Sequence, residues 1–194
     1  MPLIFTAQRD ASMNREKPRG KVLVTGANGF VGSAVVRALA AGGWHVLYCS
    51  RRKPEREEGF SWVPYDLAWQ SLPADFGVGA EVLVHAALAD QTRVDAPDPN
   101  VSGTRLLLDT LRRNGIKHRI FISSFAARAD APSQYGRQKY EIEKLFKAPD
   151  DAIVRPGLVI GDGGLFRALC RYLRRYRVVP LIDGGCQPIQ TVLD

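Results

Sequence analysis

Three glycines that follow an apolar run constrain the fold of this chain more than any other feature. The segment 22–32 reads Val-Leu-Val-Thr-Gly-Ala-Asn-Gly-Phe-Val-Gly, and a helical pattern of apolar residues follows it. A strand, a tight turn and a helix N-terminus in this order bring free backbone N–H groups and a positive dipole end to one place, where a dinucleotide pyrophosphate can bind. The spacing differs from the commoner Gly-x-Gly-x2-Gly, and an ordinary strand–helix turn without a ligand is the alternative.

Short apolar runs alternate with longer amphipathic segments from residue 21 onward. We expect strands near 21–25, 45–49, 61–64, 81–86, 118–123 and 152–155, and helices near 30–42, 100–114, 134–147 and 163–176. Strands that alternate with helices pair in parallel through right-handed crossovers. The sequence therefore predicts an α/β fold, a doubly wound parallel (Rossmann) sheet with strand order 3-2-1-4-5-6.

Composition narrows the class of protein. The 194 residues are 45% hydrophobic and 24% charged, as in a globular domain, and no apolar run approaches the ~20 residues of a membrane span. The three cysteines are isolated, so we expect no metal site, no disulfide framework and a cytoplasmic location. Residues 1–19 are polar and of mixed charge, which predicts a flexible leader. The three histidines are expected at strand ends rather than as ligands or bases.

The net charge of +7 allows two kinds of partner. It suits nucleic acid, or an enzyme for phosphorylated substrates. The basic residues cluster in part, at 51–53 and along 167–177, but no nucleic-acid-binding motif accompanies them. We therefore expect neither a nucleic-acid nor a membrane partner.

Several further motifs occur in order, and with the glycine turn they resemble the extended short-chain dehydrogenase/reductase family, in its NAD(P)-dependent epimerase/dehydratase group. The resemblance runs from Lys21 to the C-terminus. It rests on the turn at 25–32, Asp66-Leu67, His85-Ala86-Ala87, Asn100-Val101-Ser102-Gly103-Thr104, Ser123-Ser124, Tyr135-x3-Lys139, and Arg155-Pro156-Gly157 with Gly161.

The resemblance also implies a domain organisation. Residues 20–156 would form the NAD(P)-binding domain. Residues 157–194 would be an incomplete substrate-side segment, only the start of a substrate-binding lobe, because the family continues beyond the stretch in which this chain ends. Apolar residues near the end, Val178, Val179, Leu181 and Ile182, would then be exposed, which favours self-association.

The family's cofactor contacts carry over to residues of this chain. The resemblance implies that the dinucleotide is bound by Gly26, Asn28, Gly29, Phe30, Val31, Gly32, Asp66, Leu67, His85, Ala86, Ala87, Tyr135 and Lys139. Asn100 is expected to be a helix N-cap rather than a catalytic residue.

The chemistry of a carbinol explains the motif Tyr135-x3-Lys139 and the serines before it. Hydride transfer to or from such a carbon needs a proton at its oxygen, which a tyrosine supplies if its pKa, normally ~10, is lowered. Lys139 lies four residues after Tyr135, one helical turn away, and its ammonium would stabilise the phenolate. Ser123 or Ser124 would hold the substrate oxygen. A surface helix start is the alternative for Tyr135 and Lys139. Glu141 and Glu143 are expected to face away from that helix's apolar side.

The strand at 45–49 is followed by Ser50, Arg51 and Arg52 instead of an acidic residue. An acidic residue there would hold the ribose 2′-hydroxyl of NAD, whereas a hydroxyl and cations suit a 2′-phosphate. We therefore predict NADP, with NAD as the alternative cofactor. A solvated basic loop would look the same.

These observations predict an NADP-dependent oxidoreductase or epimerase acting on a carbonyl or secondary alcohol. We expect a small-molecule substrate, which could be a nucleotide sugar. The chain could also form a homodimer. The Arg-rich segment 167–177 is expected to be a solvated helix face rather than a clamp for a diphosphate. A non-catalytic NADP-binding module, or an inactive incomplete product, is the competing function.

Overall fold

The structure is a computed structural model that describes residues 19–55, 59–89, 98–178, 186 and 190–193. Most of the predicted leader, residues 1–18, lies outside this range, as do 90–97 and Val179, Leu181 and Ile182. Arg19 already belongs to the fold, because its backbone N–H donates to the Gly43 carbonyl oxygen at 3.1 Å.

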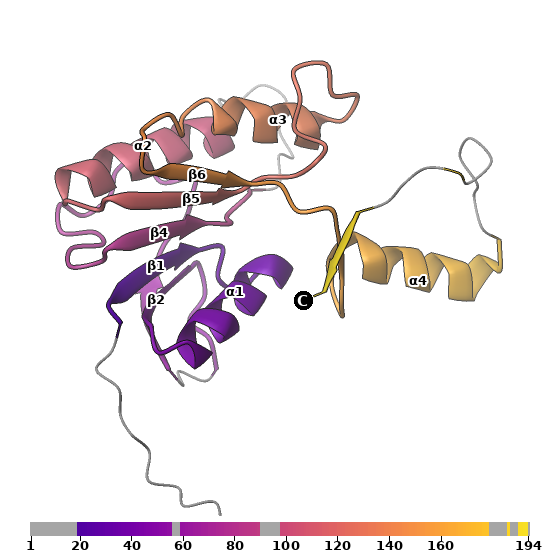
Figure 1. The fold of residues 1–194 in the computed structure, drawn as a ribbon, viewed down its shortest axis with the longest axis horizontal. Coiled ribbons are helices and arrows are strands. Elements are labelled where there is room, and N and C mark those ends of the chain that lie inside the picture. Colours follow the sequence, from indigo (N-terminus) through magenta and orange to yellow (C-terminus); the bar gives the residue numbers. More distant parts are fainter. Residues whose placement is uncertain (1–18, 56–58, 90–97, 179–185, 187–189, 194) are drawn as a thin grey trace, which may run out of the picture.

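Six parallel strands form the central sheet, in the order β3-β2-β1-β4-β5-β6 (Figure 1). This confirms the predicted fold and strand order. The strands are β1 Lys21–Thr25, β2 His45–Ser50, β3 Phe60–Pro64, β4 Val82–His85, β5 His118–Ile122 and β6 Asp151–Val154. The order reverses between β1 and β4, so a crevice forms beyond their carboxyl ends.

Helices cover both faces of the sheet. Helix α1, Phe30–Ala41, lies on one face, and α2, Pro99–Arg113, and α3, Gln134–Glu143, lie on the other (Figure 1). Helix α3 ends four residues before the predicted position, because Lys144 caps it. Helix α1 ends at Gly42, as the glycine pair in the sequence indicates.

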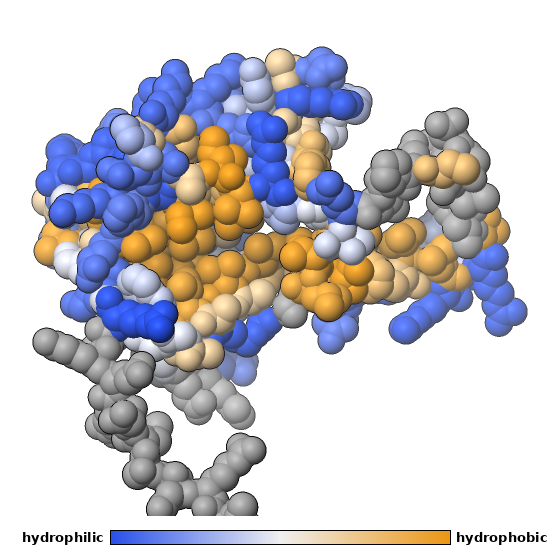
Figure 2. Space-filling view, in the orientation of Figure 1, coloured by the Kyte–Doolittle hydropathy of each residue, from blue (hydrophilic) through white to orange (hydrophobic). Residues whose placement is uncertain are grey.

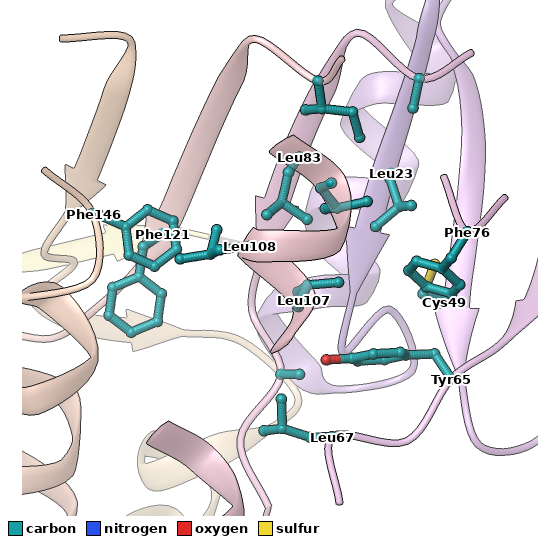
Figure 3. Close-up of a cluster of buried hydrophobic side chains, with 14 of the residues drawn as sticks. Leu23, Cys49, Tyr65, Leu67, Phe76, Leu83, Leu107, Leu108, Phe121 and Phe146 are labelled. Carbon is teal, nitrogen blue, oxygen red and sulfur yellow. The ribbon is translucent and has the colours of Figure 1, made fainter. Parts of the chain in front are cut away.

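The larger apolar core lies between the sheet and helices α2 and α3. Phe121 stacks on Phe146 with ring centroids 5.1 Å apart, and Leu107, Leu108 and Leu83 fill the space beside them (Figure 3). Strands β5 and β6 are joined by a buried ion pair from Arg119 to Asp151, with N–O distance 2.6 Å. This core fixes the strand ends that carry the site.

A smaller unit follows the sheet. Strands β7, Leu158–Ile160, and β8, Thr191–Leu193, pair in parallel beside helix α4, Gly164–Tyr176 (Figure 1). The sequence analysis missed both strands. None of the α4 residues is buried, which agrees with the expectation of a solvated arginine-rich face, and Val178 is exposed as predicted. No helix in the described part of the chain is both long and apolar enough to cross a membrane.

We expect Gly103→Ala to destabilise the protein by about 1–3 kcal/mol, because its Cβ would lie 1.9 Å from the Leu67 carbonyl oxygen. Without that contact, alanine would favour the helix over glycine. The free energy of unfolding in urea measures the change, with exposed Ser102→Ala on the same helix as the control. A stabilised Gly103→Ala protein would show that α2 does not pack tightly on the chain after Asp66.

Candidate functional site

The glycine turn is built from close backbone approaches. Gly26 has φ +67°, and a Cβ there would lie 2.6 Å from the Ala87 nitrogen. A Cβ on Gly32 would lie 2.1 Å from the Gly26 carbonyl oxygen, so α1 packs directly on the turn. The α1 N-cap, Gly29, makes no side-chain hydrogen bond. The first amides of α1 thus carry no side-chain cap and can donate to an anion.

A cavity of about 190 Å³ lies beside this turn. Its walls come from the ends of β1, β2 and β3 and from the chain after β4. They include the predicted cofactor residues Gly26, Asn28, Gly29, Ser50, Arg51, Asp66, Leu67, Ala86 and Ala87, together with Cys49, Tyr65, Leu88 and Ala89. A glycine turn with free amides at one end and a mixed polar and apolar pocket at the other fits the pyrophosphate and base of a dinucleotide.

His85 does not line the cavity, although the resemblance implies that it binds the cofactor. It is fully buried at the end of β4, where its Nδ1 lies 2.7 Å from the Thr25 hydroxyl and its Nε2 lies 2.9 Å from the Thr104 hydroxyl. Burial, with a smaller effect from Lys139, lowers the pKa of His85 to about 3. A neutral imidazole tied to two threonines is a core residue, in line with the expected strand-end role.

The three residues after β2 have different positions. Ser50 is buried, and its hydroxyl donates to the Arg52 carbonyl at 2.7 Å and accepts from the Trp62 indole at 3.2 Å. Arg51 and Arg52 are both exposed, but only Arg51 lines the cavity. Of the predicted basic pair, Arg51 is thus the cation positioned at the cavity, while Ser50 shapes the turn.

A second cavity, of about 850 Å³, brings the expected catalytic residues together. Ser124 and Tyr135 both line it, with Phe30 and Val31 from α1. The other lining residues are Phe125, Pro156, Gly157, Leu158, Val159, Gly164, Leu165 and Gln190. Apolar surface runs across this side of the molecule towards β7, β8 and α4 (Figure 2). The cavity is thus an apolar cleft with a hydroxyl pair in its wall.

Helix α3 brings Tyr135 to the cavity that Ser124 also lines. The Ser133 hydroxyl caps the helix by accepting from the Gly136 N–H at 3.1 Å. A Cβ on Gly136 would lie 2.3 Å from the Ala126 carbonyl oxygen, so the first turn packs on the segment just after β5. This contact fixes the start of the helix against the strand end that carries both serines.

Ser123 and Ser124 point to different surroundings. Ser123 is buried, and its hydroxyl donates to Glu143 Oε1 at 2.5 Å. The same carboxylate accepts from Arg155 Nε at 2.8 Å and from its Nη2 at 2.5 Å. Burial alone would raise the pKa of Glu143, but the hydrogen bonds from Arg155 and Ser123 outweigh it and hold the pKa below the ordinary value. Glu143 is thus buried and faces the polar groups of Ser123 and Arg155.

Glu143 is one of the site residues that were not predicted from the sequence. Its position four residues after Lys139 was the available signal, because such a pair shares one helix face. The glutamate joins β5, α3 and the start of the substrate side through one buried carboxylate. Ser123 thereby has a structural partner, while Ser124 remains at the cleft.

Lys139 lies beneath Tyr135 and is only 4% exposed. Its Nζ donates to the Ile122 carbonyl at 2.7 Å and lies 5.9 Å from the centroid of the Tyr135 ring. Burial lowers the pKa of Lys139 to about 8, and the charge of Glu143 opposes that shift. The lysine ammonium thus lies under the ring of the expected catalytic tyrosine.

Asn100 has a different role from the expected helix cap. The N-cap of α2 is Asp98, whose carboxylate accepts from the Asn100 backbone N–H at 2.9 Å. The buried Asn100 side chain instead accepts from the Ala89 N–H at 2.7 Å and donates to the Ala89 carbonyl at 3.1 Å. It therefore fixes one wall of the smaller cavity.

The sequence profile of the NAD dependent epimerase/dehydratase family matches residues 22–152. The chain belongs to this family. Among curated proteins, it is 34% identical over 166 residues to a ceramide reductase of Caulobacter vibrioides, covering 79% of this chain and 52% of that protein. It thus spans about half the length of this relative.

Two other similarities come from a curated protein and a solved structure. The chain is 36% identical over 119 residues to sterol demethylase protein B of Methylococcus capsulatus, covering 54% of this chain and 34% of that one. The structure of MoeE5 in complex with UDP-glucose and NAD matches with a TM-score of 0.69 and 25% identity, covering 90% of this chain and 68% of that one.

Within the described residues, no group of three histidines, cysteines or acids could hold a metal ion.

We expect Lys139→Met to change how stability depends on pH. The pKa of Lys139 falls from 10.5 to about 8 on folding, so the unfolded chain holds this proton more tightly. Relative to the variant, the free energy of unfolding of the wild type should rise by about 3 kcal/mol between about pH 8 and roughly pH 10.5. Below pH 8, the difference between the two proteins should stay constant. Urea unfolding across this range measures the difference, with exposed Lys144→Met as the control. A constant difference would contradict the burial of a charged lysine.

Proposed function

We propose that this chain forms the cofactor-binding and catalytic part of an NADP-dependent oxidoreductase that reduces a carbonyl group on a largely apolar substrate. The observation that carries the proposal is the single apolar cleft lined by both Ser124 and Tyr135, with buried Lys139 beneath the tyrosine ring. Family membership supports the dinucleotide, and the names of the relatives support redox chemistry.

Each residue has a distinct task in the proposed reaction. The bound dinucleotide supplies the hydride to the carbonyl carbon. The Ser124 hydroxyl donates a hydrogen bond to the carbonyl oxygen, and Tyr135 transfers its proton to that oxygen as negative charge develops there. Lys139 stabilises the phenolate that Tyr135 becomes, and the proton is later replaced from solvent. In the opposite direction the same residues oxidise a secondary alcohol.

The lining of the cleft favours an apolar substrate over a nucleotide sugar. A nucleoside diphosphate needs cations around its phosphates, and no described residue that lines this cleft is basic. Ceramide and sterol, which appear in the names of the two curated relatives, are mostly apolar compounds. UDP-glucose, bound by MoeE5, represents the other substrate class. We expect turnover of long-chain ketones and none of UDP-sugars.

The proposed role of Tyr135 predicts that removal of its hydroxyl oxygen strongly lowers the catalytic rate. We expect Tyr135→Phe to lower kcat by about 10²–10⁴-fold with unchanged NADPH affinity, because the phenylalanine cannot supply a proton. Ser124→Ala should also lower kcat, and Ser123→Ala should lower the free energy of unfolding instead. NADPH oxidation with a panel of apolar ketones measures the rates, with Tyr140→Phe on the same helix as the control.

The alternative of a non-catalytic binding module gives a different result. Tight NADPH binding, without turnover of any ketone or UDP-sugar by the wild type, would favour that alternative. Equal rates for wild type and Tyr135→Phe would overturn the role of the tyrosine.

The cofactor preference rests on Arg51. We expect Arg51→Ser to weaken NADPH binding by about tenfold and to leave NADH binding unchanged, because only NADPH carries the 2′-phosphate that an arginine can pair with. Arg52→Ser is the matched control, since Arg52 does not line the cavity. Fluorescence titration of both cofactors measures the affinities. An equal effect of both substitutions would show that the loop acts only through its overall charge.

A further inference from the structure

Glu143 is a buried carboxylate at the end of α3. It is 7% exposed, accepts a hydrogen bond from the Ser123 hydroxyl, and is bound by two guanidinium nitrogens of Arg155. A buried ion pair is frequently no more stabilising than apolar residues of the same volume, because each charge loses its hydration. Its contacts with the surrounding chain therefore do not by themselves explain why a charged residue lies here.

The Glu143 carboxylate and the Lys139 ammonium are fixed at consecutive residues of one strand end. The Lys139 Nζ donates to the Ile122 carbonyl at 2.7 Å, and Glu143 Oε1 accepts from the hydroxyl of Ser123, the next residue, at 2.5 Å. The two side chains are also four residues apart on α3, which places them on one face of the helix. Two opposite charges thus lie near each other where both side chains are buried and water screens them little.

The other charged and titratable groups around Lys139 differ in what they contribute. On β4, His85 is neutral because burial lowers its pKa to about 3. On the same helix, Tyr135 has its ring centroid 5.9 Å from the Lys139 Nζ. After β6, the Arg155 guanidinium is paired with Glu143. Among these groups, Glu143 supplies the negative charge that favours the ammonium form of Lys139.

We propose that Glu143 is a positioning residue of the reaction, whose buried negative charge keeps Lys139 in its ammonium form beneath Tyr135. The inference rests on the catalytic part of the proposed function, in which this ammonium stabilises the charge that develops on Tyr135. Burial lowers the pKa of Lys139 to about 8, and the charge of Glu143 opposes a further fall. Burial would raise the pKa of Glu143, but the hydrogen bonds from Arg155 and Ser123 keep it below the ordinary value, so the carboxylate stays ionised.

Two substitutions at position 143 separate the charge of the side chain from its shape. Glu143→Gln keeps the length of the side chain and an oxygen that can accept from Ser123, but it removes the charge. Glu143→Asp keeps the charge and shortens the side chain. We expect both variants to fold, because the Arg155 side chain is 47% exposed and can be hydrated when its partner changes. Exposed Glu141→Gln on the same helix also removes one negative charge and is the matched control.

The titration of Lys139 is measured without substrate, from the carbon NMR signal of its Cε in the ligand-free protein, with Lys139→Met to assign the signal. We expect the midpoint to lie near pH 8 in the wild type, Glu143→Asp and Glu141→Gln, and about one pH unit lower in Glu143→Gln. An unchanged midpoint in Glu143→Gln would overturn the inference. An equal fall in Glu143→Asp would also overturn it, because the shape of the side chain would then be the cause.

The rate of ketone reduction gives a second measurement. If the midpoint falls by about one pH unit, about a tenth of Lys139 is charged at pH 8 instead of about half. The kcat of Glu143→Gln should therefore be about fivefold below that of the wild type at pH 8 and nearly equal to it at pH 6, with unchanged affinity for NADPH. An equal loss of kcat at both pH values would indicate a purely structural role and would overturn the inference.

The outcomes separate this inference from the proposed function. A lower midpoint in Glu143→Gln with an unchanged pH dependence of kcat would overturn the inference and leave the proposed reaction intact. A wild type that reduces no ketone would overturn the proposed reaction, whereas the titration of Lys139 would still show whether Glu143 keeps this lysine charged.

Discussion

The site depends on the close approach of three backbone segments around Gly26. The turn after β1, the first turn of α1 and the chain after β4 come so near that side chains at Gly26 or Gly32 would overlap main-chain atoms. This packing leaves the α1 amides without a side-chain cap and opens the smaller cavity at the point where the strand order reverses. A dinucleotide can bind at this point because backbone, rather than side chains, forms the floor.

A second set of contacts connects the sheet to the reacting hydroxyls. Glu143 accepts hydrogen bonds from Ser123 and Arg155, so one carboxylate joins the end of β5, helix α3 and the chain that leads to β7. Lys139 is fixed by the Ile122 carbonyl and lies near the Tyr135 ring. The two serines thereby differ in role, since Ser123 stabilises the frame and Ser124 faces the cleft.

Much of this architecture follows from local sequence patterns. The alternation of strands and helices predicted the sheet order, and the spacing of Tyr135 and Lys139 predicted one helix face. Strands β7 and β8 were missed because each has three residues and pairs with a segment far along the chain. Glu143 was missed because a glutamate suggests solvent, and only the distant Arg155 and Ser123 make its burial favourable. Asn100 was misassigned because Asp98 precedes Pro99, a proline suited to the first helical position.

We infer that one dinucleotide spans both cavities, with its phosphates on the glycine turn and its reactive ring in the cleft of Ser124 and Tyr135. A crystal structure of this chain grown with NADPH tests it most directly. We expect the pyrophosphate against the first turn of α1, the adenine in the cavity of Asp66 and Tyr65, and the nicotinamide beside Tyr135. A dinucleotide bound elsewhere, or a nicotinamide ring outside the cleft that holds Tyr135, would contradict it.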